Sequence, residues 1–204
     1  MSDFLQTLPL TFTQKRAELT LLQKISACFA MALLTGILAQ IQIPLPFTPV
    51  PITGQTFAVL LAGMVLGKNW GGLSQIIYIV LGVFGMPWFS QSSSGLAILL
   101  GPSGGYLIGF ALSAFVLGYI YDTFGRPKSF VAVFALILAS NLFLIFAPGL
   151  IQLYIWTKSV TGQTPSLLTL FTLGYFPFII GDLIKAGLAA LVARGLVAHK
   201  EFLI

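Results

Sequence analysis

Three long stretches without a charged side chain constrain the fold of this chain more than any other feature. They cover residues 25–67, 69–121 and 129–157. Each is longer than the ~20 apolar residues that a membrane-spanning helix needs. Their leucine, isoleucine, phenylalanine, alanine and glycine residues fall on every helical face, whereas barrel strands alternate apolar and polar residues over short segments. The sequence therefore predicts an all-α integral membrane protein.

The composition agrees with a single membrane domain. Of the 204 residues, 57% are hydrophobic and only 7% are charged, compared with about 25% charged residues in soluble domains. We expect one transmembrane domain over residues 1–204, with a polar cytoplasmic segment 1–24, a helix bundle 25–196 and a cytoplasmic tail 197–204. The net charge of +5 is spread over loops and tails, which argues against nucleic acid as a partner.

Prolines, glycines and charges divide the chain into six predicted transmembrane helices, some of them short or broken. We expect these helices over residues 25–43, 53–66, 71–84, 106–121, 130–156 and 167–194. The fifth should bend near Pro148, and the sixth should break around Gly174 and Pro177. Three connections with at most one charge each are expected to be ordered outer loops, over residues 44–52, 85–105 and 157–166.

The positive charges predict the orientation of this bundle. Six crossings leave Lys158 on one side and Lys185 within the membrane. The other eight of the ten positive residues then share the opposite side: Lys15, Arg16, Lys24, Lys68, Arg126, Lys128, Arg194 and Lys200. Positive residues concentrate on the cytoplasmic side. We therefore expect a multi-pass protein of the bacterial inner (cytoplasmic) membrane, surrounded by lipid, with both termini in the cytoplasm.

One pair of opposite charges, Asp182 and Lys185, lies inside an apolar segment. A charge at the bilayer centre costs at least ~2.5 kcal/mol, so an ionisable residue there indicates a functional site. Residues three apart share a helical face, which places a hydrogen-bond acceptor beside a donor. Such a pair suits a small amphiphilic ligand with N–H groups and an anion, covered by apolar side chains. The alternative is a salt bridge that braces helix packing.

Two further motifs suggest pocket walls. The proline-dense loop 44–55 is rigid and apolar, and the segment 101–106 brings glycines and free N–H groups to the start of a helix. Ordinary helix connections are the alternative for both. Residues 101–104 also match the Gly-x-Ser-Gly motif of intramembrane serine proteases, but the only histidine, His199, is expected on the other side of the membrane, so a hydrolase is disfavoured. We expect no catalytic residue, metal or cofactor.

The chain resembles the BioY family, the biotin-specific substrate-binding membrane components of energy-coupling factor (ECF) transporters. The resemblance covers nearly the whole chain and is carried in order by the blocks 49–55 (PVPITGQ), 82–87 (GVFGMP), 101–106 (GPSGGY) and 177–185 (PFIIGDLIK). It implies a six-helix bundle with a pocket near the outer surface, closed by the loops after helices one, three and five. It also implies that Asp182 binds the ureido ring of biotin and Lys185 binds the valerate carboxylate.

Polar side chains of the loops and helix starts complete the predicted ligand-binding residues: Gln55, Gln91, Ser93 and Tyr106. Some relatives carry Arg directly after Gly-Gly-Tyr and Asn in the third loop, where this chain has Leu107 and Ser93. The departure implies that Lys185 holds the carboxylate without help. Residues 91–95 are small, polar and uncharged, so we expect them to form a gate over the pocket that the ligand orders.

The expected function is high-affinity binding of biotin at the outer face and its uptake into the cell. The chain has no phosphate-binding loop, so energy must come from a transmembrane coupling subunit and two ATP-binding cassette ATPases. A solitary biotin facilitator is the alternative. Small residues on the first helix are candidates for contact with the coupling subunit or, equally, for internal packing: Ser26, Ala27, Ala30, Ala32 and Gly36.

Overall fold

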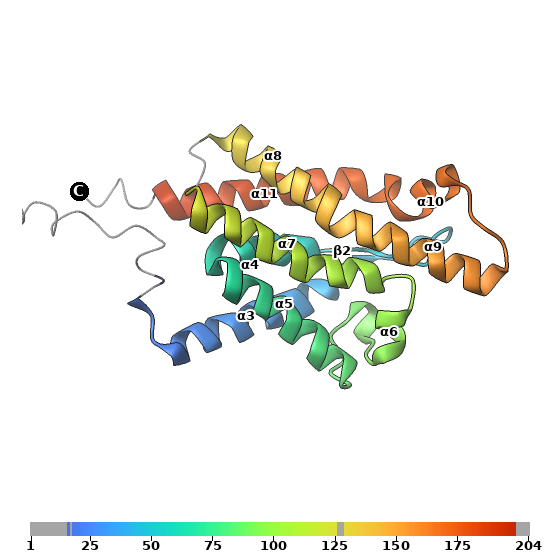
Figure 1. The fold of residues 1–204 in the computed structure, drawn as a ribbon, viewed down its shortest axis with the longest axis horizontal. Helices are drawn as coiled ribbons and strands as arrows, with labels where there is room; N and C mark the ends of the chain where they lie inside the picture. The colour runs from blue at the N-terminus through green and yellow to red at the C-terminus, as the bar shows by residue number, and fades with distance from the viewer. Residues whose placement is uncertain (1–15, 17, 126–128, 199–204) are drawn as a thin grey trace, which may run out of the picture.

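The computed structural model describes residues 16, 18–125 and 129–198, with the backbone alone for residues 194–198. In chain order its helices and strands are α3 (Leu21–Ala39), β1 (Gln42–Ile43), β2 (Ile52–Thr53), α4 (Gln55–Leu66), α5 (Lys68–Val83), η1 (Ser90–Ser92), α6 (Leu96–Leu100), α7 (Gly104–Thr123), α8 (Phe130–Ser140), η2 (Asn141–Phe146), α9 (Ala147–Thr161), α10 (Leu167–Gly174), η3 (Phe176–Phe178) and α11 (Ile179–Ala198). Helices dominate, which confirms the predicted all-α fold. Figure 1 shows α6 and α10 at the end of the bundle opposite the C-terminal end of α11.

Within the described residues, four helical segments are long and apolar enough to cross a membrane: Leu21–Ala39, Gly104–Thr123, Phe130–Thr161 and Leu167–Ala193. The helix α4 is apolar but has only 12 residues, and α5 has 16. Large apolar side chains remain exposed on the outside of the bundle, among them Phe29, Leu33 and Ile37 of α3. In water such a surface would be unfavourable, so these faces fit contact with lipid. The chain is a multi-pass membrane protein.

Both ends of the first long helix, α3, differ from the predicted ones. It begins at Leu21 rather than Ile25 because Thr20 and Gln23 form a capping box, each side chain accepting the other's backbone N–H. It ends at Ala39, because Gln42–Ile43 pairs antiparallel with Ile52–Thr53. Pro44 also disfavours a helical conformation in the residue before it. The predicted helical assignments of residues 40–43 and of Thr53 are therefore wrong.

A contact between distant segments sets the start of α5. Gly67, with φ +80°, makes the turn after α4, and Asp122 at the end of α7 accepts a hydrogen bond from Lys68 N–H at 2.9 Å. The other Asp122 oxygen forms an ion pair of 2.5 Å with Arg16 Nη2. The capped helix begins three residues before the predicted Gly71. These contacts gather Arg16, Lys68 and Asp122 at one end of the bundle.

Some predictions concern residues outside the described part of the chain. These are the positions of Lys15, Arg126, Lys128, His199 and Lys200, most of the segment 1–24, and the tail from 199 onward.

The predicted fifth helix is continuous but contains a segment of π-helix. It comprises α8, the π-helical η2 and α9, and it extends to Thr161, five residues beyond the predicted end. Pro148 explains the irregularity, since it cannot donate to the Leu144 carbonyl and its ring clashes with the preceding turn. Gly109 of α7 lies against this stretch, and a Cβ at Gly109 would come within 2.5 Å of Leu144 O.

The other boundaries differ by a few residues. The helix α7 begins at Gly104, and the predicted loop 85–105 contains the short helices η1 and α6. The sixth segment is broken between Gly174 and Ile179, where the 3-10 turn Phe176–Phe178 interrupts it, as predicted. Its last helix continues to Ala198, past the predicted end at residue 194.

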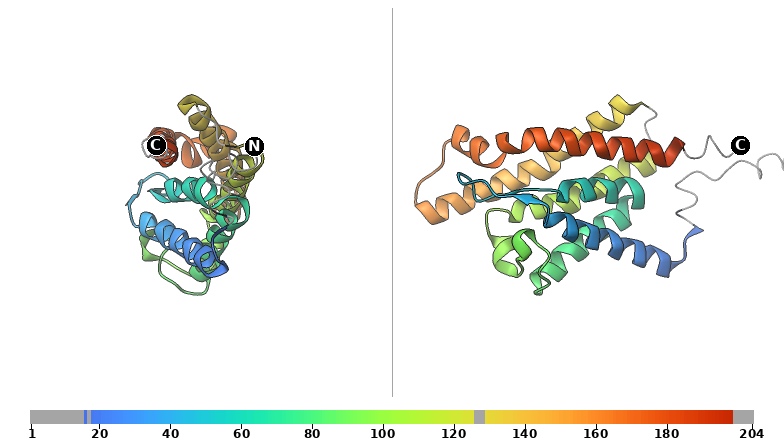
Figure 2. Two further views of the ribbon diagram at one scale, coloured as in Figure 1. Left: turned by 90° about the vertical axis from the view of Figure 1, so that its left-hand side faces the viewer. Right: turned by 180° about the vertical axis from the view of Figure 1, so that it is seen from behind.

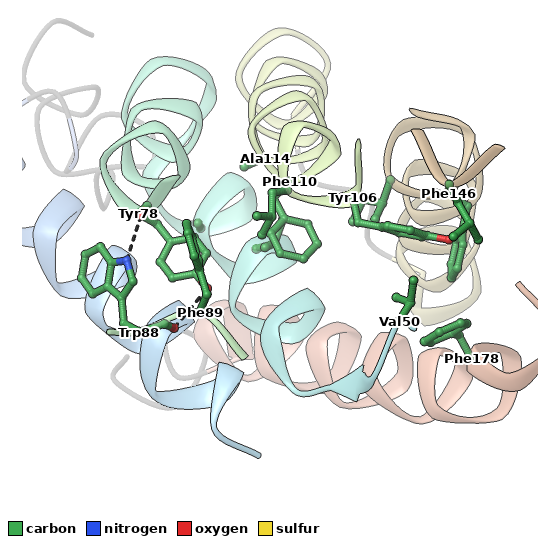
Figure 3. Packing of buried hydrophobic residues seen from close by; sticks show 14 of the residues in the cluster. Val50, Tyr78, Trp88, Phe89, Tyr106, Phe110, Ala114, Phe146 and Phe178 are labelled. Atoms are coloured by element: carbon green, nitrogen blue, oxygen red, sulfur yellow. Dashed lines mark hydrogen bonds between the residues drawn. The ribbon is translucent and has the colours of Figure 1, made fainter. Parts of the chain in front are cut away.

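Two clusters of buried side chains fill the bundle. One, here called the aromatic cluster, contains the large rings of Tyr78, Trp88, Tyr106 and Phe146 among aliphatic side chains (Figure 3). The other is built of aliphatic side chains of α4, α7, α8 and α11 together with Tyr121. In the right-hand view of Figure 2, α4 lies between α3 and α11. The helix α4 is correspondingly the most completely buried of the described helices, with nine of the ten residues from Gln55 to Met64 buried.

Candidate binding site

A cavity of about 240 Å³ opens next to the aromatic cluster. Its walls come from the loop before β2, the starts of α4 and α7, the segment after α5, the π-helical η2, the turn η3 and the start of α11. The volume is close to the lower end of small-molecule pockets, roughly 300 Å³. All six predicted ligand-binding residues line this one cavity: Gln55, Gln91, Ser93, Tyr106, Asp182 and Lys185.

The ion pair of Asp182 and Lys185 forms the charged part of the cavity wall. Lys185 Nζ lies 2.5 Å from Asp182 Oδ1 and donates a hydrogen bond to Thr53 O at 3.0 Å. The side chain of Asp182 is 7% exposed, yet neither carboxylate oxygen accepts a hydrogen bond from another group in the described part of the chain. Buried carboxylates normally accept several hydrogen bonds. This carboxylate therefore has acceptor capacity that a ligand with N–H groups would use.

The fold lowers the cost of burying this carboxylate. Asp182 stands in the first turn of α11, where the helix dipole favours negative charge. Pro177 lies in the preceding turn η3, which separates α10 from α11 and creates that helix start inside the apolar segment. The break in the sixth segment thus supplies the position at which the membrane interior can hold an acid.

Gln55 lines the cavity, but both ends of its side chain are already bonded. Its Oε1 accepts from Thr53 Oγ1 at 2.7 Å, and its Nε2 donates to Tyr78 Oη at 2.6 Å. Tyr78 is fully buried and donates in turn to Trp88 O at 3.2 Å. Gln55 is thus part of a buried polar chain that leads away from the cavity wall.

The segment Trp88–Ser93, here called the lid segment, covers one side of the cavity. Phe89, Gln91 and Ser93 line the cavity, and Gln91 is exposed on its outer side. Gln91 and Ser92 have positive φ angles of 62° and 52°. For residues other than glycine this conformation costs of the order of 1 kcal/mol each, so other contacts must stabilise it.

Gln40 at the end of α3 provides such contacts. Its Nε2 donates to Trp88 O and Phe89 O at 3.3 and 3.1 Å. Its Oε1 accepts from Ser92 N–H at 3.1 Å and from the Ser92 hydroxyl at 3.2 Å. One side chain thus binds both ends of the lid segment to α3.

Aromatic and aliphatic side chains form the apolar walls. The ring of Tyr106 meets Phe146 edge to face at 5.9 Å and Phe178 at 6.5 Å, and all three line the cavity (Figure 3). Tyr106 Oη donates to Gly174 O at 2.8 Å, so the hydroxyl holds the end of α10 and the ring faces the cavity. Leu107 is buried in the same wall.

The structure adds residues that the sequence argument missed. Thr56, in the first turn of α4, lines the cavity, and its buried Oγ1 has no hydrogen-bond partner among the described residues. Phe146 reaches the cavity from the π-helical segment, and Gln40 stabilises the lid segment. Thr56 follows Gln55 in the proline loop motif, so its place in the motif was a usable signal. Nothing in the local sequence marks Gln40.

Comparisons with known proteins identify the family of the chain. The model of the BioY family matches residues 11–201. A probable biotin transporter BioY of Methanothermobacter thermautotrophicus is 39% identical over 142 residues, which cover 70% of this chain and 90% of the relative. A biotin transporter BioY of Thermotoga maritima is 38% identical over 151 residues, covering 74% and 83%.

A solved structure has the same fold. It is the crystal structure at 2.1 Å of the S-component for biotin from an ECF-type ABC transporter. The superposition has a TM-score of 0.77 with 27% sequence identity, and it covers 93% of this chain and 95% of the other.

Proposed function

The chain belongs to the BioY family, and we propose that it binds biotin in the cavity of Asp182 and Lys185. It serves biotin uptake as the S component of an ECF transporter, and it is a transport protein rather than an enzyme. The alternatives of a solitary facilitator and an intramembrane serine hydrolase are not favoured by these relatives. The observation that carries the proposed site is the buried Asp182 carboxylate, which stands beside the Lys185 ammonium group in an apolar cavity and accepts a hydrogen bond from no other group in the described residues.

The two charged residues bind different parts of the ligand. Asp182 accepts hydrogen bonds from the ureido N–H groups, because a carboxylate offers several acceptor sites and these oxygens have no other donor in the described residues than their ion-pair partner. Lys185 has three N–H donors, of which one reaches Asp182 and one Thr53 O. The remaining donor and the positive charge suit the valerate carboxylate. The apolar body of biotin lies against Tyr106, Phe146 and Phe178.

Binding of tritiated biotin to the purified protein alone tests this proposal. We expect saturable binding without any coupling subunit or ATPase, since the whole cavity belongs to this chain. Biotin with its carboxylate capped as a bulky amide should bind more weakly, because Lys185 then loses its anionic partner. Wild-type protein that retains no biotin would contradict the proposed site.

We propose that α3 carries the surface for the transmembrane coupling subunit, which works with two ATP-binding cassette ATPases. Ala32 and Gly36 are buried and pack inside the bundle, with Gly36 against Trp88. Ser26 and Ala30 are exposed. Small exposed residues four apart allow another helix to approach closely. Ala30→Trp should abolish uptake in cells and leave biotin binding intact, whereas Leu188→Trp on the exposed face of α11 should affect neither.

We also propose six membrane crossings in the inner membrane, with both termini cytoplasmic. Besides the four long spans, α4 and α5 would make the two short crossings, joined by the turn at Gly67. Single cysteines at Ser93 and His199, in a Cys28→Ala background, test the orientation with an impermeant thiol reagent on intact cells. We expect labelling at position 93 and none at 199, and the reverse pattern would overturn the assignment.

A further inference from the structure

A chain of hydrogen bonds connects the charged part of the cavity to the lid segment. It begins where Lys185 Nζ donates to Thr53 O at 3.0 Å, and the hydroxyl of the same threonine donates to Gln55 Oε1 at 2.7 Å. Gln55 Nε2 then donates to Tyr78 Oη at 2.6 Å, and Tyr78 donates to Trp88 O at 3.2 Å. The indole Nε1 of Trp88 returns a bond to Tyr78 O at 2.9 Å (Figure 3).

The direction of these bonds excludes Tyr78 as a ligand donor and commits both ends of the Gln55 side chain to the chain of hydrogen bonds, with the second N–H of its amide left over. Tyr78 has one hydroxyl proton, and Gln55 occupies an acceptor position on that oxygen, so the proton goes to Trp88 O. Gln55 uses its carbonyl on Thr53 and its amide on Tyr78. Tyr78 is fully buried, and Gln55 is 5% exposed. In so dry a place, the loss of one partner leaves the others unsatisfied, which makes such a network sensitive to small changes.

We propose that Gln55 and Tyr78 are positioning residues that hold the lid segment closed over the ligand, and that Tyr78 does so without contacting the ligand. The proposal rests on the proposed function, because it assigns the part these residues have in biotin retention. Three features support it. The chain joins the lid to the peptide that Lys185 contacts, the lid contains two strained residues, Gln91 and Ser92, and its other side-chain attachments are to Gln40 and Gln42.

The decisive variant is Tyr78→Phe, which keeps the ring contacts with Trp88 and Phe89 and removes only the hydroxyl. We expect biotin to dissociate roughly 3- to 10-fold faster, the size typical of one buried hydrogen bond, with an association rate constant that changes less than about 2-fold. Gln55→Met should act in the same direction. Because the two residues act in series, the double variant should dissociate no faster than the faster single variant.

A second readout needs no biotin. In a Trp70→Phe, Trp156→Phe background Trp88 is the remaining tryptophan. Tyr78→Phe should shift its emission to longer wavelength and speed hydrogen exchange over residues 88–93 in the ligand-free protein. The matched control is Tyr121→Phe, which removes a buried tyrosine hydroxyl that donates to Met64 Sδ in the other cluster. It should change neither signal.

Three results would overturn the inference: a dissociation rate that Tyr78→Phe leaves unchanged, an equal effect of Tyr121→Phe, or additive effects of the two single variants. Absence of biotin binding in the wild type would instead refute the proposed function. The emission and exchange measurements on the ligand-free protein would still decide whether Tyr78 holds the lid, so the two failures are distinguishable.

Discussion

Two ion pairs with the same chemistry stand in different parts of this bundle. Arg16 and Asp122 meet at 2.5 Å, and so do Lys185 and Asp182. The carboxylate side chains are 22% and 7% exposed. The second oxygen of Asp122 accepts the Lys68 N–H at the start of α5, whereas Asp182 accepts a hydrogen bond from no described group other than its ion-pair partner. The more deeply buried acid is thus the less satisfied one.

The difference separates a structural contact from a binding site. Asp122 supplies the cap that Gly67 cannot provide, and Arg16 completes its partners, so little acceptor capacity remains for a ligand. Asp182 has no such task, although burial makes each unused acceptor costly. A salt bridge that only braced helix packing would be expected to resemble the Asp122 pair. The Asp182 pair instead has the unused hydrogen-bonding capacity of a site that a ligand completes.

The largest effect should follow from disrupting the cavity pair. Asp182→Asn and Lys185→Ala each remove one member of a buried charge-assisted contact, which typically costs 2–5 kcal/mol, so biotin affinity should fall roughly 30- to 4000-fold. Equilibrium binding of labelled biotin to purified variants measures the loss. Both variants should keep the melting behaviour of a folded bundle. Normal biotin affinity in both would mean that the pair is structural.

The matched control for that experiment is Asp122→Asn. It changes the same residue type in an ion pair of the same length, but outside the cavity, which the Asp122 side chain does not line. Substitutions at independent sites add within ~0.5 kcal/mol, so biotin affinity should stay within about 2-fold of the wild type.

Asp122→Asn should instead lower the stability of the protein. The variant loses an ion pair of a partly buried arginine and weakens the hydrogen bond at the start of α5. Helix caps contribute about 1 kcal/mol and part-exposed ion pairs up to ~1 kcal/mol, so a loss of about 1–2 kcal/mol is expected. Thermal unfolding in detergent, followed by circular dichroism, measures it. An unchanged melting temperature together with weakened biotin binding would reverse the roles assigned to the two pairs.

The sequence predicted the elements of the fold better than their limits. Long apolar stretches identify helices because lipid forbids unpaired backbone groups, and this holds for the segments that became α3, α7 and α8–α9. Helix ends depend on partners that are distant in the sequence. The cap of α5 comes from Asp122, 54 residues away from Lys68, and the end of α3 depends on the pairing of β1 with β2. No local pattern encodes either contact.

In the candidate site, too, the sequence identifies some residues but not their contacts. Asp182 and Lys185 were identifiable because a charge in an apolar segment is conspicuous. The bonding of Gln55 was not, because sequence position says that a polar side chain is near the cavity but not whether its atoms are free. The structure also places Thr56 and Phe146 in the cavity wall. Phe146 belongs to a π-helical segment, and Pro148 indicates an irregularity there but not which side chain then faces the cavity.

The smallest expected effect distinguishes a satisfied hydroxyl from an unsatisfied one on the same wall. Thr53 Oγ1 donates to Gln55, whereas the buried Oγ1 of Thr56 has no partner in the described residues. Thr53→Val should lower the free energy of unfolding by about 1 kcal/mol, because it leaves Gln55 Oε1 without its donor. Thr56→Val removes a group that already lacks a partner, so the ligand-free protein should be no less stable than the wild type.

Biotin should reverse this ranking at position 56. If the ligand provides the missing partner of the Thr56 hydroxyl, Thr56→Val should weaken biotin binding by roughly 3- to 10-fold, the range of one hydrogen bond in a dry site. Biotin would then raise the melting temperature of the variant less than that of the wild type, because stabilisation by a ligand follows its affinity. Equal affinity in both proteins would show that the unsatisfied hydroxyl takes no part in binding. Of these two unsatisfied groups, only the Asp182 carboxylate would then be expected to accept hydrogen bonds from the ligand.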